Sequence, residues 1–323
     1  MKLKPAHRQD LAAALAAATA RGEAIAEVDL SALNRVIEHQ PSDQTVTVEA
    51  GLTLGALQEL LARHGQWLPV DPAHATRLTL RELIDANLSG PRRCGHGTIR
   101  DHVLGLTVAL ADGTLARSGG RVVKNVAGYD LAKLFIGAGG SLGVVTEVTF
   151  KLKPLPQAEE FLAAPGATLE AAAQLLEAVA GSALTPVVLD LHRLDPATPG
   201  VTVVAGFAGA REDVAWETAR ARALGFTAVG DLGHEPAFWS APGAAHRLSV
   251  LPALVAPALR PLGAATFVAR AGNGVIYHRG PAAAPAPPAP GPLAVMRRLK
   301  AAFDPAGIFP NPLPPPAPGA PPV

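Results

Sequence analysis

The segment Gly137-Ala-Gly-Gly-Ser-Leu-Gly143 constrains the fold of this chain most strongly, because four of its seven residues are glycine. It departs from a Rossmann fingerprint in two ways. Its third glycine comes one position too late, and the segment leads into a strand from Val144 instead of opening a helix. No G-x-x-x-x-G-K-[ST] sequence occurs, which excludes a P-loop. Two interpretations remain: a turn whose N–H groups bind a planar or phosphorylated ligand, or a flexible connection.

Hydrophobic periodicity in the first half of the chain predicts helices mixed with antiparallel strands. A helix is expected over residues 9–21, ended by Gly22, and another begins after Thr53, whose side chain supplies the N-cap, and ends at Gly65. Period-two alternation and an Asp-Gly turn predict strands over residues 45–49, 106–110, 115–118 and 144–153.

After Pro154 the pattern changes to a second α+β unit. Helices are expected over residues 168–180 and 211–224, strands over 186–192 and 201–207, and a hairpin over 266–279. The expected division is therefore a first domain (1–153), a cap domain (154–280), a Pro-rich linker (281–292), a C-terminal helix returning to the first domain (293–311) and a disordered tail (312–323).

Composition excludes several classes of protein. A net charge of +1 without a basic cluster argues against nucleic acid as a partner. A single cysteine, Cys94, excludes an internal disulfide and is expected to be an inert thiol. The ten histidines lack metal-binding spacing, so no metal site is expected. No apolar run is long enough to span a bilayer and no signal peptide is recognised, which predicts a cytoplasmic protein.

A longer stretch around the glycine-rich segment, from Arg121 to Glu147, resembles the hallmark of a flavoprotein family. It is similar to the FAD-binding domain of the vanillyl-alcohol-oxidase and p-cresol-methylhydroxylase (PCMH) group, and within it to accessory subunits of bacterial glycolate oxidase. Further blocks fit in order: Asp29–Asn34, Val46–Gly51, Gly65–Pro69, Asn87–Arg93, Gly97–Asp101, Leu248–Pro252 and Phe303–Gly307.

The resemblance implies an α+β fold, with a two-lobed PCMH-type FAD-binding domain followed by a smaller α+β cap domain. It implies FAD as cofactor and the oxidation of glycolate or a similar small 2-hydroxy acid, with hydride moving from the substrate α-carbon to flavin N5. It also implies two partners, a larger flavin subunit and an iron–sulfur subunit, through which the chain is expected to lie peripherally at the inner membrane.

The matching blocks also imply site residues. Residues expected to contact FAD are Asn87, Ser89, Gly90, Thr98, Arg100, Asp101, Gly143 and Val145. The alternative for each is ordinary turn or strand packing. Arg92 and Arg93 are the candidate carboxylate ligands, since guanidinium binds carboxylate through two parallel hydrogen bonds, and Arg247 in the cap is a third. For the pair, the alternative is a solvated loop. The catalytic residue is not identified.

Two departures from the family concern the FAD pyrophosphate. Where relatives carry a G-G-G-T loop, this chain has Arg21–Glu27, with one glycine and two glutamates. Where relatives carry T-I-G-G, it reads Thr79-Leu-Arg-Glu82. Both changes place carboxylates near the phosphates, so FAD is expected to bind weakly or to be lost. Three hypotheses stay open: a flavin-binding oxidase subunit, a flavin-free structural subunit, and a free-standing flavoenzyme with another hydroxy-acid or alcohol substrate.

Overall fold

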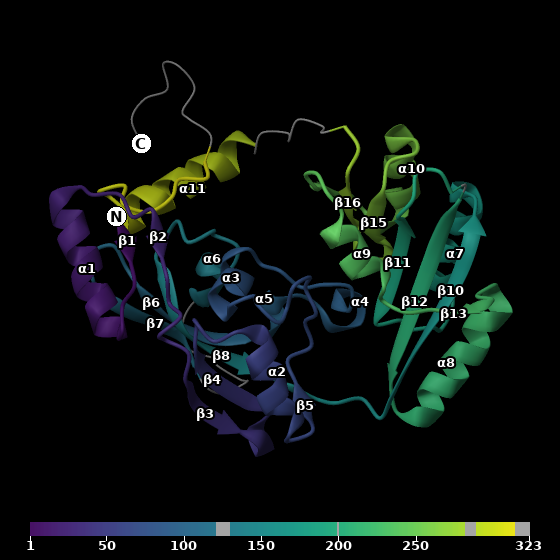
Figure 1. Cartoon of the computed structure of the whole chain (residues 1–323), viewed down its shortest axis with the longest axis horizontal. Coiled ribbons are helices and arrows are strands. Elements are labelled where there is room, and N and C mark those ends of the chain that lie inside the picture. The colour runs from purple at the N-terminus through teal and green to yellow at the C-terminus, as the bar shows by residue number, and fades with distance from the viewer. Residues whose placement is uncertain (121–129, 199, 282–288, 314–323) are drawn as a thin grey trace.

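The computed structural model describes residues 1–120, 130–198, 200–281 and 289–313, and these form two sheets with separate hydrophobic cores. Figure 1 shows the two units side by side, with the N-terminal unit bearing α1 at one end and the second unit bearing α7 and α8 at the other. Both units contain helices and strands, as the hydrophobic periodicity of the sequence predicted. We refer to the units as the N-terminal domain and the cap domain.

The N-terminal domain is built on a five-stranded antiparallel sheet. Its order is β3 (Val36–Gln40), β4 (Thr45–Glu49), β8 (Val144–Lys151), β6 (Val103–Ala109) and β7 (Leu115–Gly119). The alternation of β8 buries Val148 and Phe150 against the core. The strands predicted from period-two alternation, including the hairpin at Asp112-Gly113, are confirmed, while β3 was not predicted.

Helices flank this sheet. The longest is α1 (Arg8–Arg21), which ends where Gly22 adopts a left-handed φ of 61°, as predicted. Helix α2 (Leu54–Ala62) starts at Thr53, whose hydroxyl accepts the N–H of Ala56 and so confirms the predicted cap. The remaining pieces are short: β1 (Lys2–Leu3), β2 (Glu27–Val28), β5 (Gln66–Trp67), α3 (Leu80–Asp85), α4 (Arg93–His96), α5 (Ile99–His102), α6 (Ala132–Phe135) and β9 (Lys153–Pro154).

The cap domain is a seven-stranded antiparallel sheet. Its order is β13 (Ala228–Val229), β10 (Ala158–Ala167), β12 (Val201–Gly209), β11 (Val188–Arg193), β15 (Phe267–Arg270), β16 (Val275–His278) and β14 (His246–Ser249). Helices α7 (Leu169–Ala180) and α8 (Arg211–Leu224) pack against β10 and β12, and both were predicted. Strands β10 and β14 and the helices α9 (His234–Ser240) and α10 (Val255–Leu259) were not predicted.

The C-terminal helix α11 (Pro290–Phe303) lies over the N-terminal domain (Figure 1). It starts earlier than the expected residue 293, because Ala289 is already extended and Pro290 fits the first turn. Phe303 packs edge-on against Phe135 at 5.6 Å, and Ile308 and Phe309 enter the N-terminal core. Most of the expected linker, 282–288, and most of the expected tail, 314–323, lie outside the described residues.

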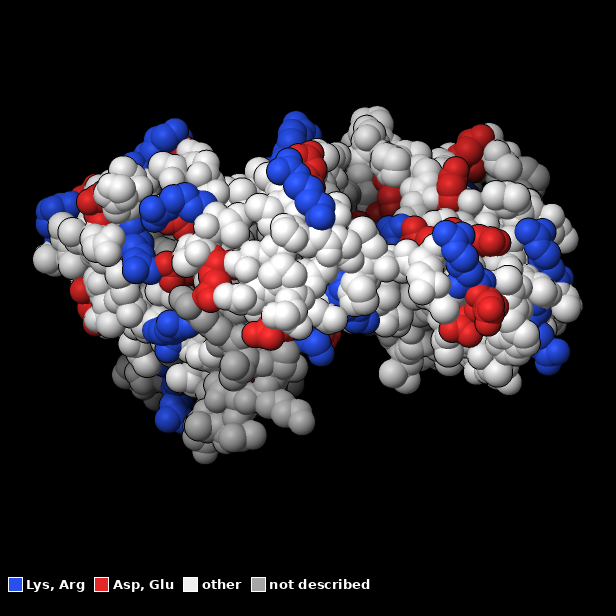
Figure 2. All heavy atoms as spheres, turned by 90° about the horizontal axis from the view of Figure 1, so that it is seen from below, with Lys and Arg blue, Asp and Glu red and all other residues white. Residues whose placement is uncertain are grey.

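The surface has no strongly charged region on the face drawn in Figure 2, where lysines and arginines are interspersed with aspartates and glutamates. This fits a chain whose formal net charge is +1. No helix in the described part of the chain is both long enough and apolar enough to span a membrane.

Candidate functional site

A cavity of about 400 Å³ lies between the two domains, and we call it the interdomain cavity. The N-terminal domain contributes residues 72–74, 78 and 86–90, which are mostly apolar or small but include His74 and Asn87, together with Arg93. The cap contributes polar and aromatic side chains: Glu235, Trp239, Arg247, Arg270 and Tyr277. An apolar floor under a few convergent polar groups is the usual composition of a site for a ring-bearing ligand.

The loop from Asn87 to Gly90 approaches the cavity with its backbone. Asn87 adopts a φ of 49° and Gly90 a φ of 96°. A Cβ at residue 90 would lie only 2.2 Å from the carbonyl oxygen of Asp71, so only glycine fits there. Ser89 is buried, and its hydroxyl accepts the N–H of Ile99 at 3.3 Å. These three predicted contact residues therefore all line one cavity.

Two arginines from different domains face this cavity. Arg93 begins α4, and Arg247 lies in the edge strand β14. Among the described residues neither has an acidic partner, and the buried Nε of Arg93 has no hydrogen-bond acceptor. Burial, with the nearby charges of Arg247 and Arg270, lowers the pKa of Arg93 below its ordinary value. Two like charges that line one cavity, with no ion pair to either among the described residues, favour an anionic ligand.

A buried charge network supports the cap side of the cavity. Asp190 on β11 and Arg270 on β15 are cross-strand partners, and Arg270 Nη1 lies 2.6 Å from Asp190 Oδ2 and 2.5 Å from Glu235 Oε1. Trp239 Nε1 donates to Glu235 Oε2 at 3.1 Å. Although burial opposes its charge, Asp190 and Glu235 raise the pKa of Arg270. Arg270 therefore holds both carboxylates and balances one of their two negative charges.

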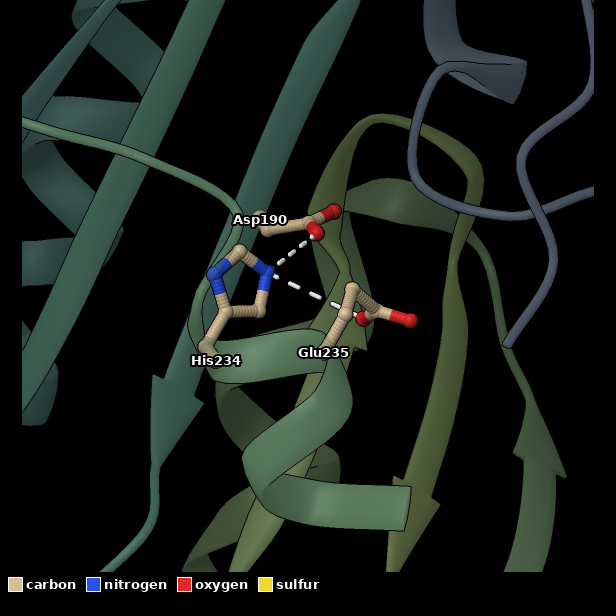
Figure 3. Close-up of side chains that lie close together, drawn as sticks. All are labelled: Asp190, His234 and Glu235. Carbon is tan, nitrogen blue, oxygen red and sulfur yellow. Dashed lines mark hydrogen bonds and ion pairs between the residues drawn. The ribbon is translucent and has the colours of Figure 1, made fainter. Parts of the chain in front are cut away.

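Three residues lie close enough together to be considered as metal ligands, which sequence spacing did not reveal (Figure 3): Asp190, His234 and Glu235. His234 and Glu235 project from α9 toward Asp190, and His234 Nε2 lies 2.9 Å from Asp190 Oδ2. The guanidinium of Arg270 already contacts both carboxylates and provides the positive charge that a cation would supply. The residues present therefore fit an ion-paired core better than a metal ion.

Arg92 does not line the cavity. Its guanidinium binds Asp71 in the N-terminal domain at 2.7 Å and Glu159 on β10 of the cap at 2.6 and 2.8 Å. Of the three candidate carboxylate ligands, Arg93 and Arg247 are the two that line the interdomain cavity. The segment that begins with Arg92 and Arg93 is not a solvated loop. Directly after these arginines, Cys94 packs on the cap core and Gly95 N donates to Val187 O at 3.2 Å.

A second cavity, of about 570 Å³, adjoins the first at Ala86, and we call it the acidic cavity. Four carboxylates line it: Glu27, Asp29, Glu82 and Asp85. Arg81 lines it as well, with its Nε 3.1 Å from Asp85 Oδ2 and its Nη1 2.6 Å from Val28 O. Lys2 and Lys4 pair with Glu27 and Asp29 at the rim. Four negative charges thus meet three positive ones.

The first turn of α3, at residues 79–82, has no N–H group left for an anion. Glu82 caps its own helix, because Thr79 N donates to Glu82 Oε2 at 2.8 Å and Glu82 N to Thr79 Oγ1 at 3.3 Å. Leu80 N donates to Leu52 O, and Arg81 N to Ala50 O. Burial raises the pKa of Asp85 to about 6 despite Arg81. The acidic cavity is therefore a poor fit for a pyrophosphate, whereas the interdomain cavity fits a ring and a small anion.

Five predicted contact residues lie away from both cavities. Thr98 and Asp101 form a capping box at the start of α5, and Arg100 Nη1 donates to Lys133 O at 2.7 Å. Val145 is buried in the N-terminal core, and a Cβ at Gly143 would lie 2.7 Å from Val108. In the described structure these residues shape the domain, and their contact with FAD stays a prediction.

Sequence reasoning missed the cap residues Glu235, Trp239, Arg270 and Tyr277, since no motif joins them to Asn87–Arg93. One signal was available. Asp190 and Arg270 each interrupt an apolar strand, and a charge in a buried strand requires a partner of opposite sign.

Comparison with known proteins adds to this geometry. Residues 27–119 match the family model described as FAD binding domain. This match lies within the N-terminal domain, and it supports FAD as the cofactor that the sequence blocks implied.

Curated relatives match about half of the chain. Glycolate oxidase subunit GlcD of Bacillus subtilis is 35% identical over 158 residues, which is 49% of this chain and 34% of that protein. Glycolate oxidase subunit GlcE of Escherichia coli is 35% identical over 151 residues, 46% of this chain and 43% of that protein. The mitochondrial D-lactate dehydrogenase (cytochrome) of Arabidopsis thaliana is 36% identical over 130 residues, 40% of this chain and 23% of that protein.

The fold extends beyond the region of clear sequence similarity. A solved structure of alkyldihydroxyacetonephosphate synthase superimposes on 95% of this chain and 75% of its own, with a TM-score of 0.70 and 18% identity. The N-terminal domain and the cap together therefore have the fold of one solved structure. The matches to the curated relatives span less than half of their length.

Proposed function

We propose that this chain is an FAD-dependent oxidoreductase subunit that acts on glycolate or a similar small 2-hydroxy acid. The observation that carries the proposal is the pair Arg93 and Arg247, which face the interdomain cavity from two domains without an acidic partner among the described residues. The names of the relatives, glycolate oxidase subunits and a D-lactate dehydrogenase, agree with such a substrate. All of these substrates carry a carboxylate beside a hydroxyl-bearing carbon.

The side chains of the cavity divide the work. Arg93 and Arg247 bind the substrate carboxylate, and guanidinium suits this because it offers two parallel N–H donors. Tyr277, whose ring meets that of Trp239 edge-on at 5.0 Å between centroids, lines the cap side of the cavity. The loop Asn87–Gly90 brings backbone to the floor. Bound FAD supplies the hydride acceptor, and the protein orients the substrate α-carbon toward it.

The chain acts, in this proposal, within a complex that contains a larger flavin subunit and an iron–sulfur subunit. It would lie in the cytoplasm and meet the inner membrane only through those partners. The relatives are themselves called subunits, which supports an assembly. No general base is assigned among the cavity residues, because Glu235 is held by Arg270 and Trp239 and His74 is exposed to solvent. We therefore expect the chain to need its partners for turnover.

A second candidate function is a flavin-free structural subunit of the same complex. The acidic cavity favours it, because the N–H groups of residues 79–82 are all bonded within the protein and four carboxylates surround the place for phosphate. Loss of two or three charge-assisted hydrogen bonds, at about 1.5–3 kcal/mol each, is enough to turn nanomolar into micromolar binding.

The experiment is to purify the full chain and record its visible spectrum, its melting curve with and without excess FAD, and its glycolate oxidation with an artificial electron acceptor. We expect weak FAD binding, seen as a rise in melting temperature only at high FAD concentration. We expect negligible turnover alone and turnover in the complex. Stoichiometric flavin retained through dialysis would contradict weak binding, and robust turnover by the isolated chain would contradict the subunit role. No response to FAD at any concentration would favour the structural candidate.

A further inference from the structure

Arg92 joins the two domains at a point outside the interdomain cavity. We infer that Arg92 is a positioning residue: its bridge to Asp71 of the FAD binding domain and Glu159 of the cap holds the cap over the cavity. Its Nη1 lies 2.7 Å from Asp71 Oδ2, while its Nε and Nη2 lie 2.8 and 2.6 Å from the two oxygens of Glu159. We call these three side chains the Arg92 bridge.

Aromatic rings from both domains enclose this bridge. The guanidinium carbon lies 5.9 Å from the ring of Trp67 in the FAD binding domain and 5.6 Å from Phe161 in the cap. Only 16% of the Arg92 side chain is exposed. A planar guanidinium stacks on rings and binds a carboxylate through two parallel N–H groups while a third N–H binds a second carboxylate, a geometry that the compact ammonium of lysine does not reproduce. The site is thus suited to arginine and draws one element of each domain onto it.

The bridge also fixes the loop that carries the cavity residues. Arg92 N donates to Asp71 Oδ1 at 3.1 Å, and Asp71 N donates to Ser89 O at 2.8 Å. Directly after Arg92, Arg93 turns into the cavity. Arg247, on the cap, faces Arg93 only while the cap is docked. Arg92 therefore acts on the site through Arg93 and through the position of the cap.

Next in the chain, Cys94 offers a natural reporter of cap docking. It is the single cysteine of the protein, and it packs against the cap core, where a Cβ at Gly272 would lie 2.5 Å from its Sγ. Burial raises the pKa of this thiol to about 11. If the cap moves away, Cys94 becomes accessible and its thiolate forms more readily, so a thiol reagent reacts faster. This readout needs neither FAD nor substrate, and it separates the inference from the proposed function.

The test is the rate at which N-ethylmaleimide labels Cys94 in the full-length protein and in Arg92→Met. We expect labelling to accelerate about tenfold or more, the size of effect typical for loss of a bidentate charged contact. Arg35→Met is the matched control, because Arg35 makes a bidentate contact with Glu49 inside the FAD binding domain. Labelling in the control is expected to stay at the wild-type rate, and Arg92→Lys is expected to fall between wild type and Arg92→Met.

Two further measurements separate cap opening from a general loss of stability. Under cap opening, labelling of Arg92→Met depends only weakly on added urea, since little surface is exposed, whereas labelling through global unfolding depends strongly on urea. Adding Glu159→Gln to Arg92→Met should slow labelling, because it removes a carboxylate left without its cation. The inference would be overturned if Arg92→Met were labelled at the wild-type rate, or if its labelling rate depended on urea as strongly as global unfolding does.

Discussion

The interdomain cavity and the acidic cavity adjoin at Ala86, yet their charges are opposite. In the first, the buried acids Asp190 and Glu235 are paired with Arg270, and Arg93 and Arg247 have no ion pair among the described residues. In the second, Arg81, Lys2 and Lys4 are paired with carboxylates, and the N–H groups of residues 79–82 are bonded internally. The first cavity therefore offers unpaired positive charge to an anion, as our proposal requires. The second offers no free N–H group of residues 79–82 to a phosphate.

The reason lies in a few side chains. In the acidic cavity Glu82 serves as the capping residue of its own short helix, so the structure uses for its stability the donors that a phosphate would need. In the interdomain cavity the two arginines come from different domains, Arg93 from the N-terminal domain and Arg247 from the cap, and neither forms an ion pair within its own domain among the described residues. Four experiments test this contrast.

The largest effect is expected from Arg270→Met. Removal of one partner from a buried ion pair costs about 3–5 kcal/mol, because the remaining charges stay buried. Asp190 and Glu235 would be left in this position, and we expect a loss of that size in the free energy of unfolding, measured by urea denaturation. Arg193→Met is the control, because Arg193 donates to backbone carbonyls of Gly200 and Gly263 within the same domain. Equal losses in the two variants would contradict a special role for the buried charges.

Arg93→Ala and Arg247→Ala test whether these two residues serve a ligand. Each is expected to lower glycolate affinity in the assembled complex by about 10- to 100-fold, the range for a lost charge-assisted bond. Because the two arginines repel each other, neither change should lower the free energy of unfolding by much. Arg298→Ala on the exposed side of α11 is the control for glycolate titrations. Unchanged affinity in both cavity variants would remove the basis of the proposed function.

Glu82→Gln tests the acidic cavity from the opposite side. The amide keeps a capping oxygen for Thr79 and removes one negative charge, so FAD affinity should rise by about three- to fivefold. The measurement is the shift in melting temperature across a series of FAD concentrations. Glu38→Gln, at the exposed strand β3, serves as a charge-matched control outside this cavity. A fall in FAD affinity would mean that Glu82 assists the cofactor.

The smallest effect concerns pH. The Asp85 carboxyl, with its pKa raised to about 6, is ionised at pH 7.5 and largely protonated at pH 5.5. Protonation removes a negative charge from the acidic cavity, so FAD affinity should rise about two- to threefold as the pH falls through 6. Stability should follow the same direction, since a carboxyl whose pKa is raised on folding favours the folded state less as pH rises from about 4 to 6.

Asp85→Asn identifies the group responsible. It should make FAD affinity nearly independent of pH over this range and hold it at the higher value. Asp71, whose pKa burial also raises to about 6 against the effect of Arg92, lies in the Arg92 bridge and is unchanged in this variant. A pH dependence that survives in Asp85→Asn would assign the effect elsewhere.

Local sequence signals predicted much of the fold. Thr53, Thr168 and Gly22 mark helix ends through hydrogen bonds and backbone angles that depend on adjacent residues. Strand β10 escaped prediction, because its sequence AEEFLAAPGA lacks alternation and its stability comes from pairing with β12. The order of the cap strands likewise depends on contacts between distant segments, which local periodicity does not encode.

For the site, the ordered sequence blocks indicated FAD as the cofactor and suggested the loop Asn87–Gly90 and the arginines 92, 93 and 247 as contacts, through a family resemblance. Their contacts with cofactor and substrate stay predictions. Only the tertiary structure decided that Arg93 and Arg92 have different surroundings, one facing a cavity and the other two carboxylates. Adjacent residues on a short helix point in different directions, and their partners are supplied by elements far away in the sequence. The buried pairing of Asp190 with Arg270 was decided in the same way, by strand register across the cap.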